Sequence, residues 1–282
     1  MKTQTAEPGF LYVTATPIGN ASDITIRALD VLRTVDAVAC EDTRVTSRLF
    51  SLHGINVPLV AYHEHNAAKV RPGIIKRLKS GDSMAIVSDA GTPLVSDPGY
   101  KLVTACIDEG LQVTALPGAS AVLCALVLSG LPSDRFLFEG FLAPKSGARK
   151  KILRELSSIP ATLVFMESPR RLAASLSDMA TVLGERRASV SREITKLFEE
   201  TRRGTLAELA DHYKNAGAPK GEVMIVVGAP DAKKIAIDEI ILEEMLRNSL
   251  TENSVRDAVR LVAEATGLPR QMVYQQALAL TK

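Results

Sequence analysis

Short apolar runs, many of them β-branched, alternate with segments of helical period through the first half of the chain. Such runs, bounded by polar or Gly/Pro stretches, are typical of buried strands. Strands that alternate with helices predict right-handed crossovers and a parallel sheet with helices on its faces. The predicted strands are residues 10–16, 37–40, 58–62, 84–88 and 112–116, and the predicted helices are residues 24–35 after a cap at Asp23, 47–54, 74–79 and 100–110.

The loops that follow these strands hold the unusual residues. In parallel α/β sheets the ligand crevice lies beyond the carboxyl ends of the strands, so we expect these loops to surround one site. All of them are polar or rich in Gly and Pro. They are Thr16-Pro17-Ile18-Gly19-Asn20, Glu41-Asp42-Thr43-Arg44, His63-Glu64-His65-Asn66, Asp89-Ala90-Gly91-Thr92-Pro93 and Pro117-Gly118-Ala119-Ser120.

The second half predicts another α/β layer, with strands of mixed direction, and then a helical tail whose last two helices are typical of a helix-turn-helix pair. The predicted fold class is therefore α/β, with two α/β domains at residues 1–120 and 121–230 and a small helical segment at 231–282. The predicted strands are residues 136–142, 162–166, 188–192 and 222–227, and the predicted helices are residues 150–158, 171–183, 206–213, 235–250, 255–265 and 271–280.

Charge is unevenly distributed along the 282 residues. The formal net charge is only +2, but residues 143–220 hold 15 Lys and Arg against 9 Asp and Glu. This basic middle segment hints at a polyanionic partner, although a solvated helical surface accounts for it equally well. Residues 235–282 are acidic on balance, which weakens a nucleic-acid role for the tail. The tail is then either a packing or dimer-supporting appendage or an RNA-contacting module.

The chain lacks the marks of a secreted or membrane protein. Cys40, Cys106 and Cys124 lie among apolar neighbours without a CxxC pair, which indicates reduced thiols. The N-terminus has no apolar signal core, and the most apolar run, residues 119–131, is too short to span a bilayer. We expect a soluble, cytoplasmic protein with no membrane partner.

Several kinds of chemistry find no support. Neither a P-loop nor a dinucleotide GxGxxG fingerprint is present, and His63 and His65 have no third ligand at a zinc-like spacing, so we expect no metal site. Ser120 lacks a nucleophile elbow and is expected to cap a helix. The Asp89-Ala90-Gly91-Thr92-Pro93 loop is different, because small residues after a buried strand let the backbone approach a ligand.

These motifs together resemble the tetrapyrrole methylase-like (class III) methyltransferases. The resemblance runs from about residue 11 to residue 227 and continues weakly through the tail. The Glu41 and Ser88 blocks are specific to a branch that acts on ribosomal RNA, and they differ from the Gly-Gly-Asp-Pro loop of the cobalamin-pathway members. The matching blocks are Thr16-Pro17-Ile18-Gly19-Asn20, Glu41-Asp42-Thr43-Arg44, Val87-Ser88-Asp89-Ala90-Gly91-Thr92-Pro93, Ser96-Asp97-Pro98-Gly99-Tyr100, Leu116-Pro117-Gly118, Gly130-Leu131-Pro132-Ser133-Asp134-Arg135-Phe136 and Lys220-Gly221-Glu222.

The resemblance implies a homodimer with S-adenosylmethionine in the cleft between two α/β domains. It implies methylation of the ribose 2′-hydroxyl of a cytidine in the decoding region of 16S rRNA, on free rRNA or on the small ribosomal subunit. Carried over by motif position, the methyl donor would contact Pro17, Asp89, Ala90, Gly91, Thr92, Pro93, Ser120 and Ala121 from the first domain and Met166, Gly221 and Glu222 from the second.

Methyl transfer to a ribose hydroxyl requires alignment of the acceptor and benefits from a positioned base. The candidate bases at strand ends are Glu41, His63, Asp89 and Glu167, unless a phosphate or water takes the proton. Arg44, Arg170, Arg192 and Lys196 are the candidates for phosphate or ribose contacts, with ion pairs to Glu41 or Glu193 as the structural alternative. Two other functions remain open: a methyltransferase for a tetrapyrrole or other small substrate or for a protein side chain, and a non-catalytic RNA- or DNA-binding protein.

Overall fold

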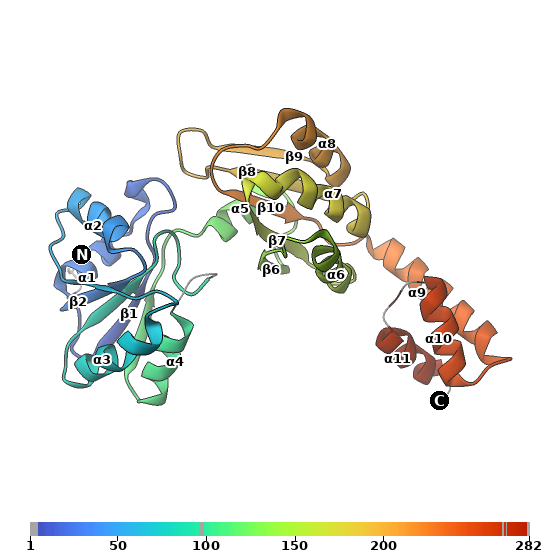
Figure 1. Cartoon of the computed structure of the whole chain (residues 1–282), viewed down its shortest axis with the longest axis horizontal. Coiled ribbons are helices and arrows are strands. Elements are labelled where there is room, and N and C mark those ends of the chain that lie inside the picture. The colour runs from blue at the N-terminus through green and yellow to red at the C-terminus, as the bar shows by residue number, and fades with distance from the viewer. Residues whose placement is uncertain (1–4, 96–98, 267, 269, 281–282) are drawn as a thin grey trace.

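The first domain is a five-stranded parallel sheet in the order β3-β2-β4-β1-β5, in this computed structural model (Figure 1). The structure describes residues 5–95, 99–266, 268 and 270–280; the Ser96-Asp97-Pro98 part of one motif and Gly267 and Pro269 of the predicted tail turn lie outside them. The elements are β1 (Phe10–Thr14), η1 (Ala21–Asp23), α1 (Ile26–Thr34), β2 (Ala37–Cys40), α2 (Thr43–Leu52), β3 (Leu59–Ala61), α3 (Ala67–Lys79), β4 (Met84–Val87), α4 (Tyr100–Asp108) and β5 (Gln112–Leu116).

Helices cover both faces of this sheet because its inner strands are apolar on both sides. Tyr12 and Val38 pack with α1 and α2, whereas Leu11 and Ile86 pack with α3 and α4. All four side chains are buried, at 0–2% exposure. The predicted parallel, doubly covered sheet is confirmed.

Three helices in the first domain begin elsewhere than predicted, and one of them is α2, which begins at Thr43 rather than at residue 47. The predicted cap Asp23 ends η1, and the residue that caps α1 is Thr25, whose hydroxyl accepts from the backbone of Ala28 at 3.1 Å. Helix α3 begins at Ala67, well before the predicted start at residue 74, and includes Pro72. Pro72 is the sixth residue of α3, beyond its first turn, so the helix forms there without one backbone hydrogen bond.

The second domain holds a mixed sheet in the order β6-β7-β10-β8-β9, in which only the β6–β7 pair is parallel. The predicted mixed sheet is confirmed, but strand β9 was not predicted from the sequence. Helices α6, α7 and α8 cover one face, and α5 covers part of the other. The elements are α5 (Ala121–Ser129), β6 (Phe136–Phe141), α6 (Ser146–Leu156), β7 (Thr162–Glu167), η2 (Pro169–Arg171), α7 (Leu172–Leu183), β8 (Arg187–Arg192), β9 (Glu200–Thr205), α8 (Leu206–Ala216) and β10 (Val223–Val227).

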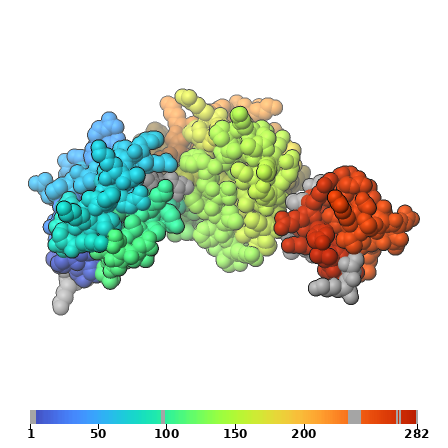
Figure 2. All heavy atoms as spheres, turned by 60° about the horizontal axis from the view of Figure 1, so that its bottom comes forward, coloured from blue at the N-terminus to red at the C-terminus, as the bar shows by residue number. Residues whose placement is uncertain are grey.

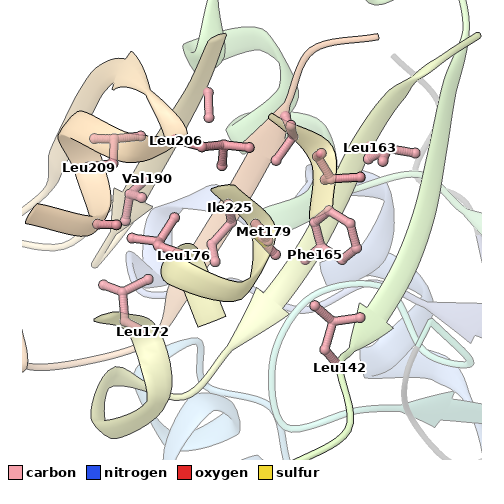
Figure 3. Packing of buried hydrophobic residues seen from close by; sticks show 14 of the residues in the cluster. Leu142, Leu163, Phe165, Leu172, Leu176, Met179, Val190, Leu206, Leu209 and Ile225 are labelled. Carbon is pink, nitrogen blue, oxygen red and sulfur yellow. The ribbon is translucent and has the colours of Figure 1, made fainter. Parts of the chain in front are cut away.

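The main core of the second domain lies between its sheet and the α6–α8 layer (Figure 3). Phe165 and Ile225 from neighbouring strands meet Leu172, Leu176 and Met179 from α7, and all five are fully buried. Deleting any one of the large side chains in such a packed core costs several kcal/mol, about 2–5 for a Leu or Met truncated to Ala. This layer fixes the strand ends that carry the second-domain part of the site.

The remaining helices form a lobe of their own at the end of the chain (Figures 1 and 2). They are α9 (Ala232–Leu250), α10 (Val255–Thr266) and α11 (Arg270–Leu280). Leu246, Val262 and Val273, one from each helix, are buried in a small apolar cluster. The predicted helical appendage is confirmed.

Candidate functional site

The carboxyl ends of the first sheet bring the predicted loops together. Hydrogen bonds join three of them. Gly91 and Thr16 exchange backbone hydrogen bonds at 2.9 and 3.0 Å, and the Thr92 hydroxyl donates to the Ala119 carbonyl at 3.2 Å. Gly91 has φ +76°, and a Cβ there would lie 3.4 Å from Cγ2 of Ile18. The loops after β1, β4 and β5 therefore form one continuous wall whose backbone is closely packed at Gly91.

The second domain faces this wall with the segments around Met166, at the end of β7, and Gly221-Glu222, before β10. Gly221 has φ +86°, and a Cβ there would coincide with Oε1 of Glu193. That carboxylate accepts from Nζ of Lys196 at 3.1 Å, and the Lys196 chain lies against Gly19 of the first domain. The two domains thus approach each other where glycines leave space for long side chains.

Two adjoining cavities lie between the domains and share Ile18 and Glu222. The first, here called the apolar cavity, has a volume of about 270 Å³. Its lining residues are Ile18, Ala121, Phe141, Met166, Glu167, Ser168, Pro169, Ile194, Gly221, Glu222, Val223 and Met224.

The second, here called the α2 cavity, has a volume of about 260 Å³ and is bordered by helix α2. It is more polar in character than the first, since Asp89, Arg48 and Lys196 border it. Its lining residues are Thr16, Pro17, Ile18, Gly19, Ala21, Val45, Thr46, Arg48, Leu49, Leu52, Ser88, Asp89, Ala90, Lys196 and Glu222.

The residues predicted to hold the methyl donor divide between these cavities. Ala121, Met166, Gly221 and Glu222 line the apolar cavity, whereas Pro17, Asp89 and Ala90 line the α2 cavity. The remaining four, Gly91, Thr92, Pro93 and Ser120, line neither cavity and belong to the loops that support the wall.

These residues fit a sulfonium nucleoside. Cofactor pockets are concave, mostly apolar and furnished with a few polar groups, which describes the two cavities taken together. The small side chains of Ala90 and Ala121, with Gly221, keep space free where larger residues would fill it. Ser120 caps α5, as expected, by accepting from the backbone of Leu123 at 3.4 Å.

Three of the candidate bases lie at the ends of neighbouring strands. Glu41 follows β2, His63 lies just beyond β3, and Asp89 lies just beyond β4. Burial and then the nearby charge of Asp89 raise the pKa of Glu41, and His63 opposes this effect. The backbone N–H of Asp42 donates to Oδ1 of Asp89 at 3.0 Å, which holds that carboxylate beside the Glu41 segment. Among the described residues, the buried Nδ1 of His63 has no hydrogen-bond partner.

Glu167, the fourth candidate, is in different surroundings. It is 3% exposed, and its carboxylate accepts from the Ser175 hydroxyl at 2.5 Å, from the Ser168 backbone at 2.7 Å and from Arg171 at 2.6 Å. Both oxygens are engaged, so these contacts favour an anchoring role for Glu167 over proton transfer.

Three of the four predicted substrate-binding cations are ion-paired. Arg44 contacts Asp42 at 2.6 Å and lowers the pKa of that carboxyl to about 2. Arg192 contacts Glu200 at 2.8 Å, and Lys196 contacts Glu193, so the expected alternative of structural pairing applies to Lys196 but involves different partners for the two arginines. Arg170 is exposed and, among the described residues, forms no ion pair.

Sequence reasoning missed three residues that shape the site and gave a fourth, Glu193, only as an ion-pair alternative. Ile18 divides the two cavities, Phe141 lines one of them and Arg48 lines the other. Glu193 holds Lys196 from a backbone with φ +49°, a conformation that non-glycine residues rarely adopt. The motif Thr16-Pro17-Ile18-Gly19 could have pointed to Ile18, since an isolated apolar residue in a site loop needs a buried environment, but nothing in the sequence signals the positive φ of Glu193.

Comparison with known proteins agrees with this geometry. The family model of the tetrapyrrole (corrin/porphyrin) methylases matches residues 11–210, and that of the RsmI C-terminal HTH domain matches residues 236–281. Among solved structures, diphthine synthase superposes with a TM-score of 0.60 at 17% identity, covering 78% of this chain and 89% of that one. A uroporphyrin-III C-methyltransferase from Thermus thermophilus complexed with S-adenyl homocysteine superposes with a TM-score of 0.54 at 17% identity, covering 80% of this chain and 99% of that one.

The chain therefore belongs to the tetrapyrrole methylases, a class of methyltransferases built from two α/β domains around a cleft. A curated relative from Mesorhizobium japonicum, "Ribosomal RNA small subunit methyltransferase I", is 51% identical over 96% of this chain and 92% of its own length. Within the class, the chain belongs to the ribosomal RNA small subunit methyltransferase I family.

Membership of this family confirms two expectations from the sequence, the methyltransferase class and the use of S-adenosylmethionine. Within the described part of the chain, no helix has the length and apolar character needed to cross a bilayer. The described residues also contain no group of three or more His, Cys, Asp or Glu side chains arranged to hold a metal ion.

Proposed function

We propose that the protein methylates the ribose 2′-hydroxyl of a cytidine in the decoding region of 16S rRNA, in the cytoplasm, with S-adenosylmethionine as donor. The observation that carries this proposal is the full-length similarity to small-subunit rRNA methyltransferases, at 51% identity for one relative. Similarity to the uroporphyrin enzymes is limited to the fold, at 17–20% identity. A tetrapyrrole or other small substrate is therefore the weaker alternative, and a purely nucleic-acid-binding role does not account for the methylase domain.

The donor site in this proposal is the apolar cavity together with the 89–93 loop. Ala121, Met166 and Gly221 offer small or apolar surfaces to the nucleoside, and Glu222 borders both cavities. When bound, S-adenosylmethionine supplies a methyl group on a sulfonium centre. The chain's own task is then to exclude water, to align the acceptor oxygen and to remove its proton.

We assign the proton-accepting role to the Glu41–Asp89 pair. Asp89 lines the α2 cavity, and Glu41 lies behind it with a pKa raised by burial and by the charge of Asp89. A carboxylate of raised pKa is a stronger base, and general-base catalysis contributes about 10²–10⁴-fold. His63 contributes a partly buried ring beside Glu41 and opposes the rise in the pKa of Glu41.

The pH profile of the reaction tests this assignment. Removing the charge in Asp89→Asn lowers the pKa of Glu41, so the acid limb of kcat/KM should move to lower pH, whereas Glu41→Gln should lower kcat. Calorimetry of donor binding separates these effects from a weakened donor site. An acid limb that stays unchanged in both variants would exclude the pair as the base.

The acceptor nucleotide would enter through the α2 cavity. Arg48 and Lys196 border this cavity from the first and second domains respectively, and cations of this kind hold backbone phosphates. Arg44, Arg170 and Arg192 are further candidate contacts, since Arg44 belongs to α2, which borders this cavity, and the other two belong to the basic segment 143–220. The basic excess in residues 143–220 supports an RNA substrate.

We further propose that two copies of the chain associate and that the domains divide at residues 120 and 230. Large apolar side chains are exposed on α5 and in the β8–β9 loop, with Val127 at 76% and Leu197 at 89% exposure. Large apolar side chains exposed in this way are candidates for the contact between two copies. Light scattering of the purified protein gives its mass in solution and tests the dimer directly.

The function is tested by incubating the protein with labelled methyl donor and small subunits from methylation-deficient cells. The label should appear on the ribose of one cytidine near the decoding region, and the phosphodiester bond on the 3′ side of that nucleotide should resist alkaline hydrolysis. Parallel reactions with protein-free 16S rRNA distinguish the two forms of substrate. Label in a tetrapyrrole, with none in rRNA, would overturn the proposal.

A further inference from the structure

The loops that follow β6 and β7 lie next to each other at the rim of the apolar cavity. The two strands pair in parallel, with Phe141 opposite Met166, so both loops leave the sheet at the same edge. Phe141, Ser168 and Pro169 line the cavity itself. Side chains that these loops present to solvent therefore lie at the rim of the donor cavity, which adjoins the α2 cavity where the acceptor nucleotide would enter.

A buried ion pair fixes the first loop. Arg149, which is 3% exposed, contacts Asp178 at 2.5 Å and donates to the carbonyls of Ala143 and Pro144 at 3.3 and 3.2 Å. Hydrogen bonds from Arg149, Ser146 and Lys150 outweigh the effect of burial and lower the pKa of Asp178, which stays ionised. The backbone of residues 143–144 is thus tied to helices α6 and α7.

A second ion pair fixes the neighbouring turn. Arg171 contacts the buried Glu167 at 2.6 Å and donates to the carbonyl of Leu142 at 3.3 Å. Because Arg171 belongs to the turn after β7 and Leu142 to the loop after β6, this side chain joins the two loops. Ser175 on α7 donates to the same carboxylate. The two loops and α7 therefore form one rigid assembly.

Two cations project from this assembly without ion-pair partners among the described residues. Lys145 directly follows the carbonyls that Arg149 holds, and Arg170 directly precedes Arg171. Both are exposed. Buried ion pairs rarely stabilise a fold more than apolar residues of the same size would. One buried pair, and a second pair whose carboxylate is buried, under the same two loops therefore point to a need for precise placement of the side chains that the loops carry.

We propose that Lys145 and Arg170, at the rim of the donor cavity, form a phosphate-binding platform for the RNA strand whose acceptor nucleotide enters the adjoining α2 cavity. Arg149, Asp178, Glu167 and Arg171 are positioning residues that hold the platform in place. The partner chemistry is the sugar–phosphate backbone of single-stranded RNA, which a lysine and an arginine at fixed separation contact through neighbouring phosphates. This inference rests on the proposed function, because it presumes an RNA substrate.

The salt dependence of RNA binding tests the platform. Each phosphate contact to single-stranded RNA contributes about 0.7 to the slope of log K against log salt, so Lys145→Ala with Arg170→Ala should reduce that slope by about 1.4. The matched control replaces Lys101 and Lys214, two exposed lysines on other faces, by Ala. Donor affinity by calorimetry should stay unchanged in both double variants.

The possible results separate the two hypotheses. If the wild-type protein neither binds nor methylates small subunits, the proposed function fails and the platform fails with it. If the wild type binds and methylates them, but the Lys145/Arg170 variant keeps the wild-type slope or matches the control, the platform alone is refuted. The conservative variant Lys145→Arg should retain the wild-type slope.

The positioning role needs its own variant, because losing only one member of a buried pair risks unfolding. Arg149→Met combined with Asp178→Leu replaces the pair by apolar groups of similar size. We expect a folded protein with a several-fold higher KM for small subunits, an unchanged kcat and a reduced salt slope. A folded variant with wild-type KM and slope would show that the pair serves stability only and would overturn its positioning role.

Discussion

Gly221 packs against Glu193, whose partner Lys196 lies against Gly19 of the first domain, so a substitution at Gly221 tests the packing beside the domain contact. Its φ of +86° suits glycine alone, and a methyl group there would take the place of the Glu193 carboxylate. Glu193 would have to move, and with it would go the 3.1 Å contact to Lys196 beside Gly19. Gly221→Ala therefore perturbs the backbone conformation and the wall of the donor cavity at once.

The size of the effect follows from these two contributions. A non-glycine residue in the left-handed region costs about 1–2 kcal/mol, and a partly exposed ion pair contributes about 0–1 kcal/mol. A loss of 1 kcal/mol lowers the Tm of a chain of this size by about 2–4 °C. If the free protein relaxes around the methyl group, the same strain appears on donor binding instead, as an affinity about 5–30 times weaker.

The assay combines thermal unfolding with calorimetry of S-adenosylmethionine binding. Gly217→Ala is the matched control, because Gly217 also has a positive φ, +79°, but a Cβ there meets no atom within 4 Å. The control should lose stability and keep wild-type donor affinity. If both variants bind the donor equally well, or if both weaken it alike, the contact between Gly221 and Glu193 does not shape the donor cavity.

Three further predictions concern the wall, the core and acid stability. Gly91→Val should abolish donor binding in calorimetry while the circular dichroism spectrum persists, because φ is +76° and the added side chain presses on Ile18; wild-type affinity would contradict this. Phe165→Ala removes a fully buried ring and should lower the unfolding free energy in urea by about 3–5 kcal/mol, a loss under 1 kcal/mol being incompatible with the packing. Hydrogen bonds from the backbone and hydroxyl of Ser83 lower the pKa of Asp36, so its stabilisation is present above pH 4 and is lost as pH falls through the folded-state pKa. Asp36→Asn should therefore show a smaller loss of stability between pH 6 and pH 3 than the wild type, and equal losses would refute the assignment.

Much of the fold could be predicted from the sequence because the patterns that produce it lie within short segments of the chain. The apolar runs at β2 and β4 coincide closely with the predicted strands, since buried parallel strands have to be apolar throughout. Strand β9, Glu200–Thr205, was missed for the opposite reason. It is a polar edge strand, Glu-Thr-Arg-Arg-Gly-Thr, and only its pairing with β8 makes it a strand.

The site was partly predictable for a similar reason. Parallel strands end at one edge, so the sequence alone brought Glu41, His63 and Asp89 together. These residues are separated from those that face the donor by Ile18, whose side chain lines both cavities. That insertion is a tertiary event between segments far apart in the chain, as is the positive φ of Glu193, and neither leaves a local pattern.

Ile18 also limits how the molecule opens. Although it belongs to a loop of the first domain, it is 6% exposed and packs among Val122, Val164 and Met224 of the second. Exposing the Ile18 side chain to water would cost about 1.5–3 kcal/mol. Molecules in which the two domains have separated at Ile18 would therefore be a few per cent of the total or fewer. Ile18 thus holds the two domains together. The rate at which the demethylated donor dissociates should rise when the Ile18 side chain is shortened.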